Sequence, residues 1–126
     1  MAAAPDKPAL LVVEDDGLIR LDLVYTLEDM GYGVLEAANA DEAIKTLEKS
    51  PNIVAVLTDI DMPGPINGLT LAKIVHDDWA HCKVLVISGR YHPSEHVLPP
   101  GARFLTKPIS DTLLGRVLAE AGIMPG

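Results

Sequence analysis

Acidic side chains, a hydroxyl group and a lysine follow successive apolar runs of this 126-residue sequence, each where a run ends. They are Glu14, Asp15 and Asp16 after the first run, Asp59 and Asp61 after the third, Ser88 and Gly89 after the fourth, and Lys107 after the fifth. Ligand sites of parallel α/β sheets lie at the carboxyl ends of the strands. We therefore expect these groups to converge at one edge of a sheet.

Three of these carboxylates have the chemistry of a divalent-cation site. Carboxylates packed together repel one another unless a cation neutralises them. Magnesium suits such a site, because it binds one or two carboxylates and keeps several waters or phosphate oxygens. We expect Glu14 and Asp15 to hold Mg²⁺, with Asp59 completing the cluster.

The remaining groups fit phosphoryl transfer. An aspartate carboxylate can act as a nucleophile toward phosphorus, so Asp59 is the predicted acceptor. Lys107 would place a positive charge near the phosphoryl oxygens, and Ser88 would donate a hydrogen bond from its hydroxyl. Gly89 has no side chain, so it would leave room for the phosphoryl group and expose its backbone amide.

Each residue also has an ordinary structural explanation. The segment 14–16 could be a solvated turn with a helix N-cap, Asp59 a strand-end cap, Ser88 a turn residue and Lys107 a surface lysine. Their order at successive strand ends argues against all of these explanations holding together.

Five apolar runs supply the predicted strands. They are Ala9–Val13, Gly33–Ala37, Ile53–Thr58, Lys83–Ile87 and Ala102–Thr106. Most are rich in Val, Leu and Ile and do not alternate with polar residues, as expected for strands buried on both faces of a parallel sheet.

Helical periodicity separates the runs. The predicted helices are Gly17–Met30, Ala40–Lys49, Leu69–Trp79 and Asp111–Ala121. Asn39 and Glu42 have capping-box spacing. The segment Tyr91–Gly101 contains three prolines, so at most a short helix fits around Ser94–Val97. The alternation predicts an α/β fold, a parallel sheet with helices on both faces and a degenerate fourth helix.

Composition narrows the possible functions. The formal net charge of −8 argues against a nucleic-acid surface, which needs a basic stripe. The sequence has a single cysteine, Cys82, so an internal disulfide is impossible. We expect Cys82 to lie at the edge of the core and the four histidines to lie on the surface. No apolar run approaches the ~20 residues of a membrane span, and residues 1–8 lack the form of a signal peptide, so we expect a cytoplasmic protein.

Four segments together resemble the receiver domains of two-component response regulators, the CheY-like superfamily. They are Leu10-Leu11-Val12-Val13-Glu14-Asp15-Asp16, Leu57-Thr58-Asp59-Ile60-Asp61-Met62-Pro63, Val86-Ile87-Ser88-Gly89 and Phe104-Leu105-Thr106-Lys107-Pro108. The resemblance spans about residues 8–121. It implies a doubly wound five-stranded sheet in the order 2-1-3-4-5, and we expect residues 1–126 to form a single, free-standing receiver domain.

The resemblance also implies roles for individual residues. Asp59 would be the phosphorylated residue, Mg²⁺ would be bound by Glu14, Asp15, Asp59 and the backbone carbonyl of Asp61, and Lys107 would pair with the phosphoryl group. Ser88 would be a switch hydroxyl and Phe104 a switch aromatic, for which the alternative is plain core filling. The backbone amides of Ile60 and Gly89 would contact phosphate, and the Lys107–Pro108 bond would be cis.

This sequence departs from the family pattern in three places. Residues 64–66 lengthen the loop after Met62-Pro63. The segment between Ser88 and Lys107 is short and proline-rich, which puts the family's usual dimer surface in doubt. Arg90 and Asp61 sit at positions that flank the phosphoryl group, where an ion pair would restrict attacking water.

The predicted function is that of a response regulator and not of an enzyme. A histidine kinase or a histidine phosphotransfer protein would be the partner, and the output would be a conformational switch, a protein contact or onward phosphorelay. Two alternatives stay open: a phosphatase of the haloacid dehalogenase type, in which Asp59 and Asp61 would be nucleophile and general acid, and a pseudo-receiver that only binds.

Overall fold

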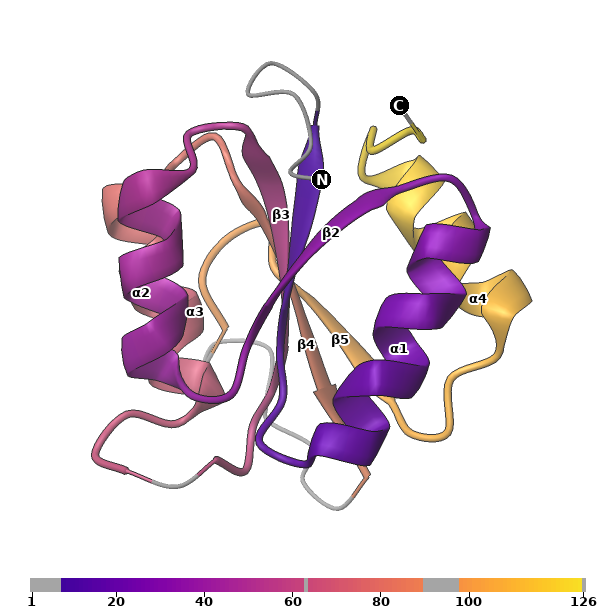
Figure 1. Cartoon of the computed structure of the whole chain (residues 1–126). Helices are drawn as coiled ribbons and strands as arrows, with labels where there is room; N and C mark the ends of the chain where they lie inside the picture. Colours follow the sequence, from indigo (N-terminus) through magenta and orange to yellow (C-terminus); the bar gives the residue numbers. More distant parts are fainter. Residues whose placement is uncertain (1–7, 63, 90–97, 126) are drawn as a thin grey trace.

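The chain folds into a five-stranded parallel sheet covered by helices on both faces (Figure 1). The computed structural model describes residues 8–62, 64–89 and 98–125. The strands are β1 (Ala9–Val13), β2 (Gly33–Ala37), β3 (Ile53–Asp59), β4 (Lys83–Ser88) and β5 (Arg103–Thr106). The helices are α1 (Gly17–Asp29), α2 (Ala40–Lys49), α3 (Gly68–Asp78) and α4 (Asp111–Glu120). The strand order β2-β1-β3-β4-β5 confirms the order that the family resemblance implies.

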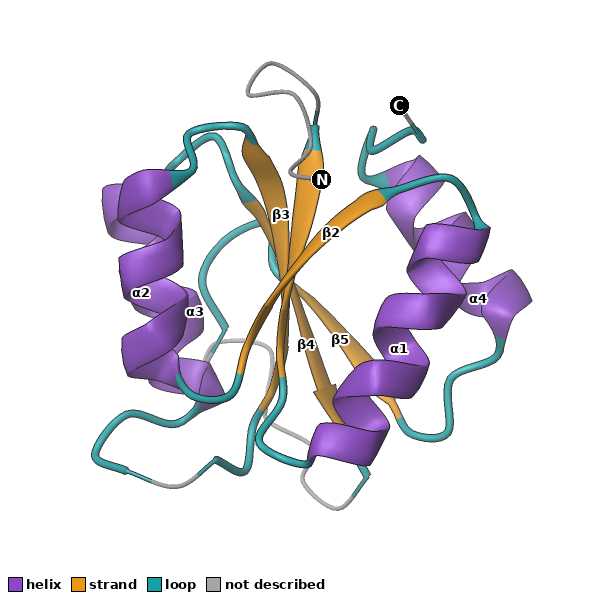
Figure 2. Ribbon diagram, viewed as in Figure 1, coloured by secondary structure: helices purple, strands orange, loops and turns teal. Residues whose placement is uncertain are grey.

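Each face of the sheet has its own apolar core. Helices α2 and α3 cover one face, and α1 and α4 cover the other (Figure 2). Leu47 of α2 and Leu71 of α3 belong to the first core, and Leu27 of α1 and Leu118 of α4 to the second. The sheet is thus held between two layers of helices, as its buried central strands predict.

The central strands follow the prediction more closely than the edge strands. All of β1 and nearly all of β4 are buried, whereas β2 and β5 are half-exposed along most of their length. The edge strands β2 and β5 each have only one strand neighbour, so more of their surface stays exposed. Their apolar composition alone did not distinguish them from the central strands. Strand β5 begins at Arg103, one residue later than predicted, and β3 and β4 extend one residue further, through Asp59 and Ser88.

Side-chain caps set the helix starts. Asp16 accepts hydrogen bonds from the amides of Leu18 and Ile19 and so caps α1. Asn39 accepts from the Glu42 amide, and Glu42 accepts in return from the Ala38 amide, close to the predicted capping box. Cap residues also explain the one-residue differences between the predicted and the observed helix ends. Helix α1 ends at Asp29, with Met30 as its C-cap, α4 ends at Glu120, and α3 runs from Gly68 to Asp78 instead of from Leu69 to Trp79.

Two predictions fall on residues outside the described part of the chain. The short fourth helix around Ser94–Val97 is one, and the Arg90–Asp61 ion pair is the other. Among the described residues, no helix is both long and apolar enough to cross a membrane.

Candidate phosphoryl-acceptor site

The register of the sheet brings the predicted site residues to one edge. Val13 pairs with Thr58 across β1 and β3, so Glu14 and Asp59, the next residues along, emerge side by side. On the other side Asp59 pairs with Ile87 of β4. Ser88 pairs with Thr106 of β5, and the Lys107 amide, one residue further, donates to the Ser88 carbonyl at 2.9 Å.

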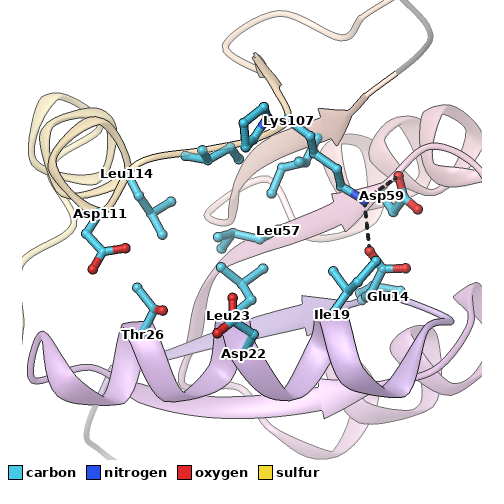
Figure 3. Close-up of a pocket in the computed structure, with 14 residues that line it drawn as sticks. Glu14, Ile19, Asp22, Leu23, Thr26, Leu57, Asp59, Lys107, Asp111 and Leu114 are labelled. Atoms are coloured by element: carbon cyan, nitrogen blue, oxygen red, sulfur yellow. Dashed lines mark hydrogen bonds and ion pairs between the residues drawn. The ribbon is translucent and has the colours of Figure 1, made fainter.

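Lys107 reaches back across the sheet edge to both acidic groups. Its Nζ lies 3.1 Å from Oε1 of Glu14 and 3.6 Å from Oδ1 of Asp59 (Figure 3). The three side chains are separated by up to 93 positions in the sequence. The lysine side chain is 30% exposed, whereas that of Asp59 is 12% and that of Glu14 only 5% exposed. Lys107 is therefore not a free surface lysine, because its ammonium group is paired with two acidic side chains.

Glu14, Asp15 and Asp59 form a compact oxygen cluster. One carboxylate oxygen from each residue lies within 4.8 Å of the others. Asp15 is exposed, so the cluster opens to solvent on one side. An all-carboxylate donor set with an open side fits Mg²⁺, which keeps part of its water shell when it binds protein.

Burial sets the electrostatics of this cluster. Desolvation raises the pKa of Asp59 above its usual value, and the charge of Lys107 only partly opposes it. The pKa of Glu14 is also raised, first by burial. For Lys107 burial acts to lower the pKa, but the hydrogen bond to Glu14 and the charges of Asp59 and Glu14 outweigh it, so the pKa is raised. The carboxylates therefore lack full compensation, and a cation would stabilise them.

The other predicted residues lie nearby with differing exposure. Ser88 is buried at 1% exposure, and the neighbouring Gly89 is exposed. Among the described residues, a Cβ placed on Gly89 would meet the Lys107 side chain alone, at 3.6 Å, in ordinary contact. The Ile60 amide donates to the Ile87 carbonyl at 3.3 Å and also lowers the pKa of Asp59, so the Asp59 carboxylate and the Ile87 carbonyl share it. The Lys107–Pro108 peptide is cis, as expected.

Asp61, Phe104 and Cys82 differ in how far they are buried. Asp61 is exposed in the loop after β3. Phe104 is half-buried and packs against the core beneath α2 and α3, which is compatible with core filling and with a switch. Cys82 is 6% exposed, its Sγ contacts the Ile53 carbonyl oxygen at 3.1 Å, and burial raises its pKa to about 11.

Sequence analysis missed Gly68, the first residue of α3. A Cβ placed there would lie 1.9 Å from the carbonyl oxygen of Asp59, and the Gly68 amide donates to the Ile60 carbonyl at 2.9 Å. Helix α3 therefore begins in direct contact with the backbone of the acceptor. In the sequence, Gly68 is an ordinary glycine beside the N-cap Asn67. Its neighbouring residues do not indicate that it contacts the backbone of Asp59.

A cavity of about 500 Å³ adjoins the cluster between α1 and α4. Glu14, Asp59 and Lys107 line one end, and Asp22, Thr26 and Asp111 lie further along it (Figure 3). Most of the remaining lining is apolar, from residues such as Leu23, Leu57 and Leu114.

Comparison with known proteins agrees with this geometry. The family model of the response regulator receiver domain matches residues 10–119, which is most of the chain. The chain therefore belongs to the response regulator receiver family.

Individual relatives support the assignment. The chain is 33% identical over 113 residues to the putative two-component response regulator ARR21 of Arabidopsis thaliana, covering 88% of this chain and 18% of that protein. It is 30% identical over 124 residues to the sensor protein TorS of Escherichia coli K12, covering 91% of this chain and 13% of TorS. The chain thus spans less than a fifth of either relative. The solved receiver domain of the hybrid histidine kinase CckA is 33% identical, with a TM-score of 0.75 over 90% of this chain and 97% of that one.

Proposed function

We propose that this chain accepts a phosphoryl group on Asp59 from a phosphorylated histidine of a partner protein, in a magnesium-dependent reaction. The observation that carries the proposal is the meeting of Lys107, Glu14, Asp15 and Asp59 at one sheet edge, with one lysine facing two largely buried carboxylates, those of Glu14 and Asp59. Metal, nucleophile and counter-charge then share one small site, which is what phosphoryl transfer to a carboxylate needs.

In the proposed transfer, the P–N bond of the phosphohistidine breaks and a bond forms between phosphorus and a carboxylate oxygen of Asp59. The imidazole keeps the electron pair of the broken bond and takes up a proton. Glu14 and Asp15, with the carbonyl of Asp61, would hold Mg²⁺, which when bound supplies positive charge to the phosphoryl oxygens. Lys107 turns its ammonium group from Glu14 toward the same oxygens, and the amide of Gly89 donates to them.

The signal would arise from a shift between two conformations. A phosphoryl group on Asp59 offers acceptor oxygens that the Ser88 hydroxyl can approach, and movement of Ser88 would change the packing space open to Phe104. In this account the chain is a phosphoacceptor that assists its own phosphorylation and dephosphorylation. Its output is a protein contact or onward relay, with no direct role for nucleic acid.

A histidine kinase or histidine phosphotransfer protein is the proposed partner. Sensor proteins occur among the relatives, and the surface beside the acceptor suits protein contact. Leu18 is 81% exposed and Tyr25 62% exposed on α1, and Ile19 of the same helix lines the cavity that reaches Asp59. An apolar helix surface continuous with the acceptor site favours a partner that covers both. Leu18→Asp should therefore slow transfer from a phosphorylated kinase while leaving labelling by acetyl phosphate unchanged, and equal slowing of both reactions would contradict this role.

Mass spectrometry of the intact protein tests the proposed function. Acetyl phosphate with Mg²⁺ should add one phosphoryl group to the wild type, and chelation of the metal should abolish the addition. Asp59→Asn should stay unlabelled, whereas the matched variant Asp61→Asn, which changes an exposed carboxylate two residues away, should be labelled. An unlabelled wild type would favour the pseudo-receiver, and catalytic turnover of a small phosphate ester would favour the phosphatase.

A further inference from the structure

Arg20 joins three elements beside the carboxylate cluster of Glu14, Asp15 and Asp59, although its sequence context predicts no role for it. It is the fourth residue of α1, and its side chain is only 23% exposed. Its Nη1 donates to the backbone carbonyl of Glu14 at 2.8 Å, and its Nε donates to Oε1 of Glu36 on β2 at 3.0 Å. One guanidinium thereby links the end of β1, the start of α1 and the edge strand β2.

The contact to Glu14 completes the restraint of that residue. The Glu14 amide donates to the Ala37 carbonyl at 3.1 Å, Oε2 accepts from the Asp16 amide at 3.2 Å, and Oε1 accepts from Lys107. The remaining polar group of Glu14, its carbonyl, is the one that Arg20 holds. Every polar atom of this 4%-exposed residue therefore has a hydrogen-bond partner, and two of the partners, Ala37 and Lys107, are distant in the sequence.

We infer that Arg20 is a positioning residue for the metal site. The peptide that carries the Glu14 carbonyl also carries the amide of Asp15, so the guanidinium fixes the plane from which the Asp15 side chain leaves the turn. A guanidinium suits this task, because its planar fork can donate to a carbonyl and a carboxylate at the same time in a fixed geometry. Arg20 does not contact the cluster's carboxylate oxygens in this arrangement; it acts through the backbone of the residues that do.

The inference rests on the proposed function only in taking the Glu14, Asp15 and Asp59 cluster as a Mg²⁺ site. Groups that orient metal ligands commonly change metal affinity by 10- to 100-fold when they are removed. Arg20→Gln removes the guanidinium and keeps a polar side chain. We expect it to weaken Mg²⁺ binding about tenfold or more, while the folded protein keeps its overall structure.

Calorimetric titration with Mg²⁺ alone tests this expectation, with amide NMR spectra to confirm folding. Arg103→Gln is the matched control, since it breaks an Arg–Glu ion pair of 3.1 Å between β5 and α4, away from the cluster, and should leave the affinity unchanged. Glu36→Gln removes the negative charge of one Arg20 partner but keeps the bond to the Glu14 carbonyl, so it should weaken binding much less than Arg20→Gln. If Arg20→Gln does not fold, Arg20→Lys should still bind Mg²⁺ severalfold more weakly, because an ammonium group lacks the planar fork.

Equal Mg²⁺ affinity of the wild type and the folded Arg20 variant would overturn the positioning role alone. So would an effect of Glu36→Gln as large as that of Arg20→Gln, because the ion pair to β2 would then account for it. A wild type that binds Mg²⁺ but takes no phosphoryl group would overturn the proposed function and leave the role of Arg20 standing. A wild type that binds no Mg²⁺ would overturn both.

Discussion

Gly68→Ala should destabilise this protein, although glycine-to-alanine changes in helices usually stabilise. The added Cβ would lie 1.9 Å from the Asp59 carbonyl oxygen and 2.8 Å from the Ile60 Cα, and both of these are backbone atoms. The first distance is about 1.5 Å shorter than an ordinary van der Waals contact, so α3 and the end of β3 must move apart.

The expected cost follows from these contacts. Overpacking costs about 1–3 kcal/mol, and loss of the bond from the Gly68 amide to Ile60 about 1 kcal/mol more. Better helix propensity returns at most about 1 kcal/mol. The net loss is about 2 kcal/mol, which for a chain of this size lowers Tm by about 8 °C.

Gly115 supplies the matched control. It lies within α4, and a Cβ there would meet no atom of the described part of the chain within 4 Å. Thermal unfolding followed by circular dichroism should show Gly115→Ala up to about 1 kcal/mol more stable than the wild type, and Gly68→Ala less stable. A Gly68→Ala protein with unchanged or higher Tm would refute the reasoning, since the close contact would then carry no cost. The change should also displace Asp59 and slow its labelling by acetyl phosphate, whereas Gly115→Ala should be labelled normally.

Three further predictions concern charge and burial. Mg²⁺ at about 100 times its Kd should stabilise the protein by about 2.7 kcal/mol in thermal unfolding. Asp15→Asn should remove most of this stabilisation. If the variant is stabilised by Mg²⁺ as much as the wild type, Asp15 is not part of the site. Because the pKa values of Asp59 and Glu14 are raised above their ordinary 3.8 and 4.5, the folded metal-free protein holds these protons more tightly than the unfolded chain and loses stability as the pH rises through the raised values. Urea unfolding at about pH 4, near the ordinary aspartate value, and at about pH 8 should therefore show a weaker loss for Asp59→Asn than for the wild type, and identical losses would contradict the raised pKa of Asp59. Cys82, with its pKa near 11 and its buried thiol, should react with a thiol reagent only as fast as the protein opens, and a native rate equal to that in urea would contradict its burial.

The sequence was sufficient for the sheet and for the meeting of the main site residues. Strands β1, β3 and β4 are continuous apolar runs, and the polar residue after each run identifies the edge at which Glu14, Asp59 and Ser88 emerge. The one-residue errors at helix ends arose because caps such as Met30 depend on local hydrogen bonds that periodicity does not report.

Contacts between distant segments were beyond that reasoning. Gly68 matters because α3 starts against the backbone of β3, and Arg20 because the first turn of α1 lies beside the ends of β1 and β2. Neither relation has a local sequence signature, since each depends on how the helices are placed once the sheet has formed. The half-exposure of β2 and β5 has the same origin, because edge position is a property of strand order and not of composition.

The identity of the acceptor tests the account most directly. Protein treated with acetyl phosphate and Mg²⁺ can be reduced with borohydride, which converts an aspartyl phosphate to homoserine, and then digested and sequenced by mass spectrometry. We expect homoserine at position 59 alone, dependent on Mg²⁺ and strongly reduced in Lys107→Met. Homoserine at Asp15 or Asp61, or none in a protein that binds Mg²⁺, would contradict it.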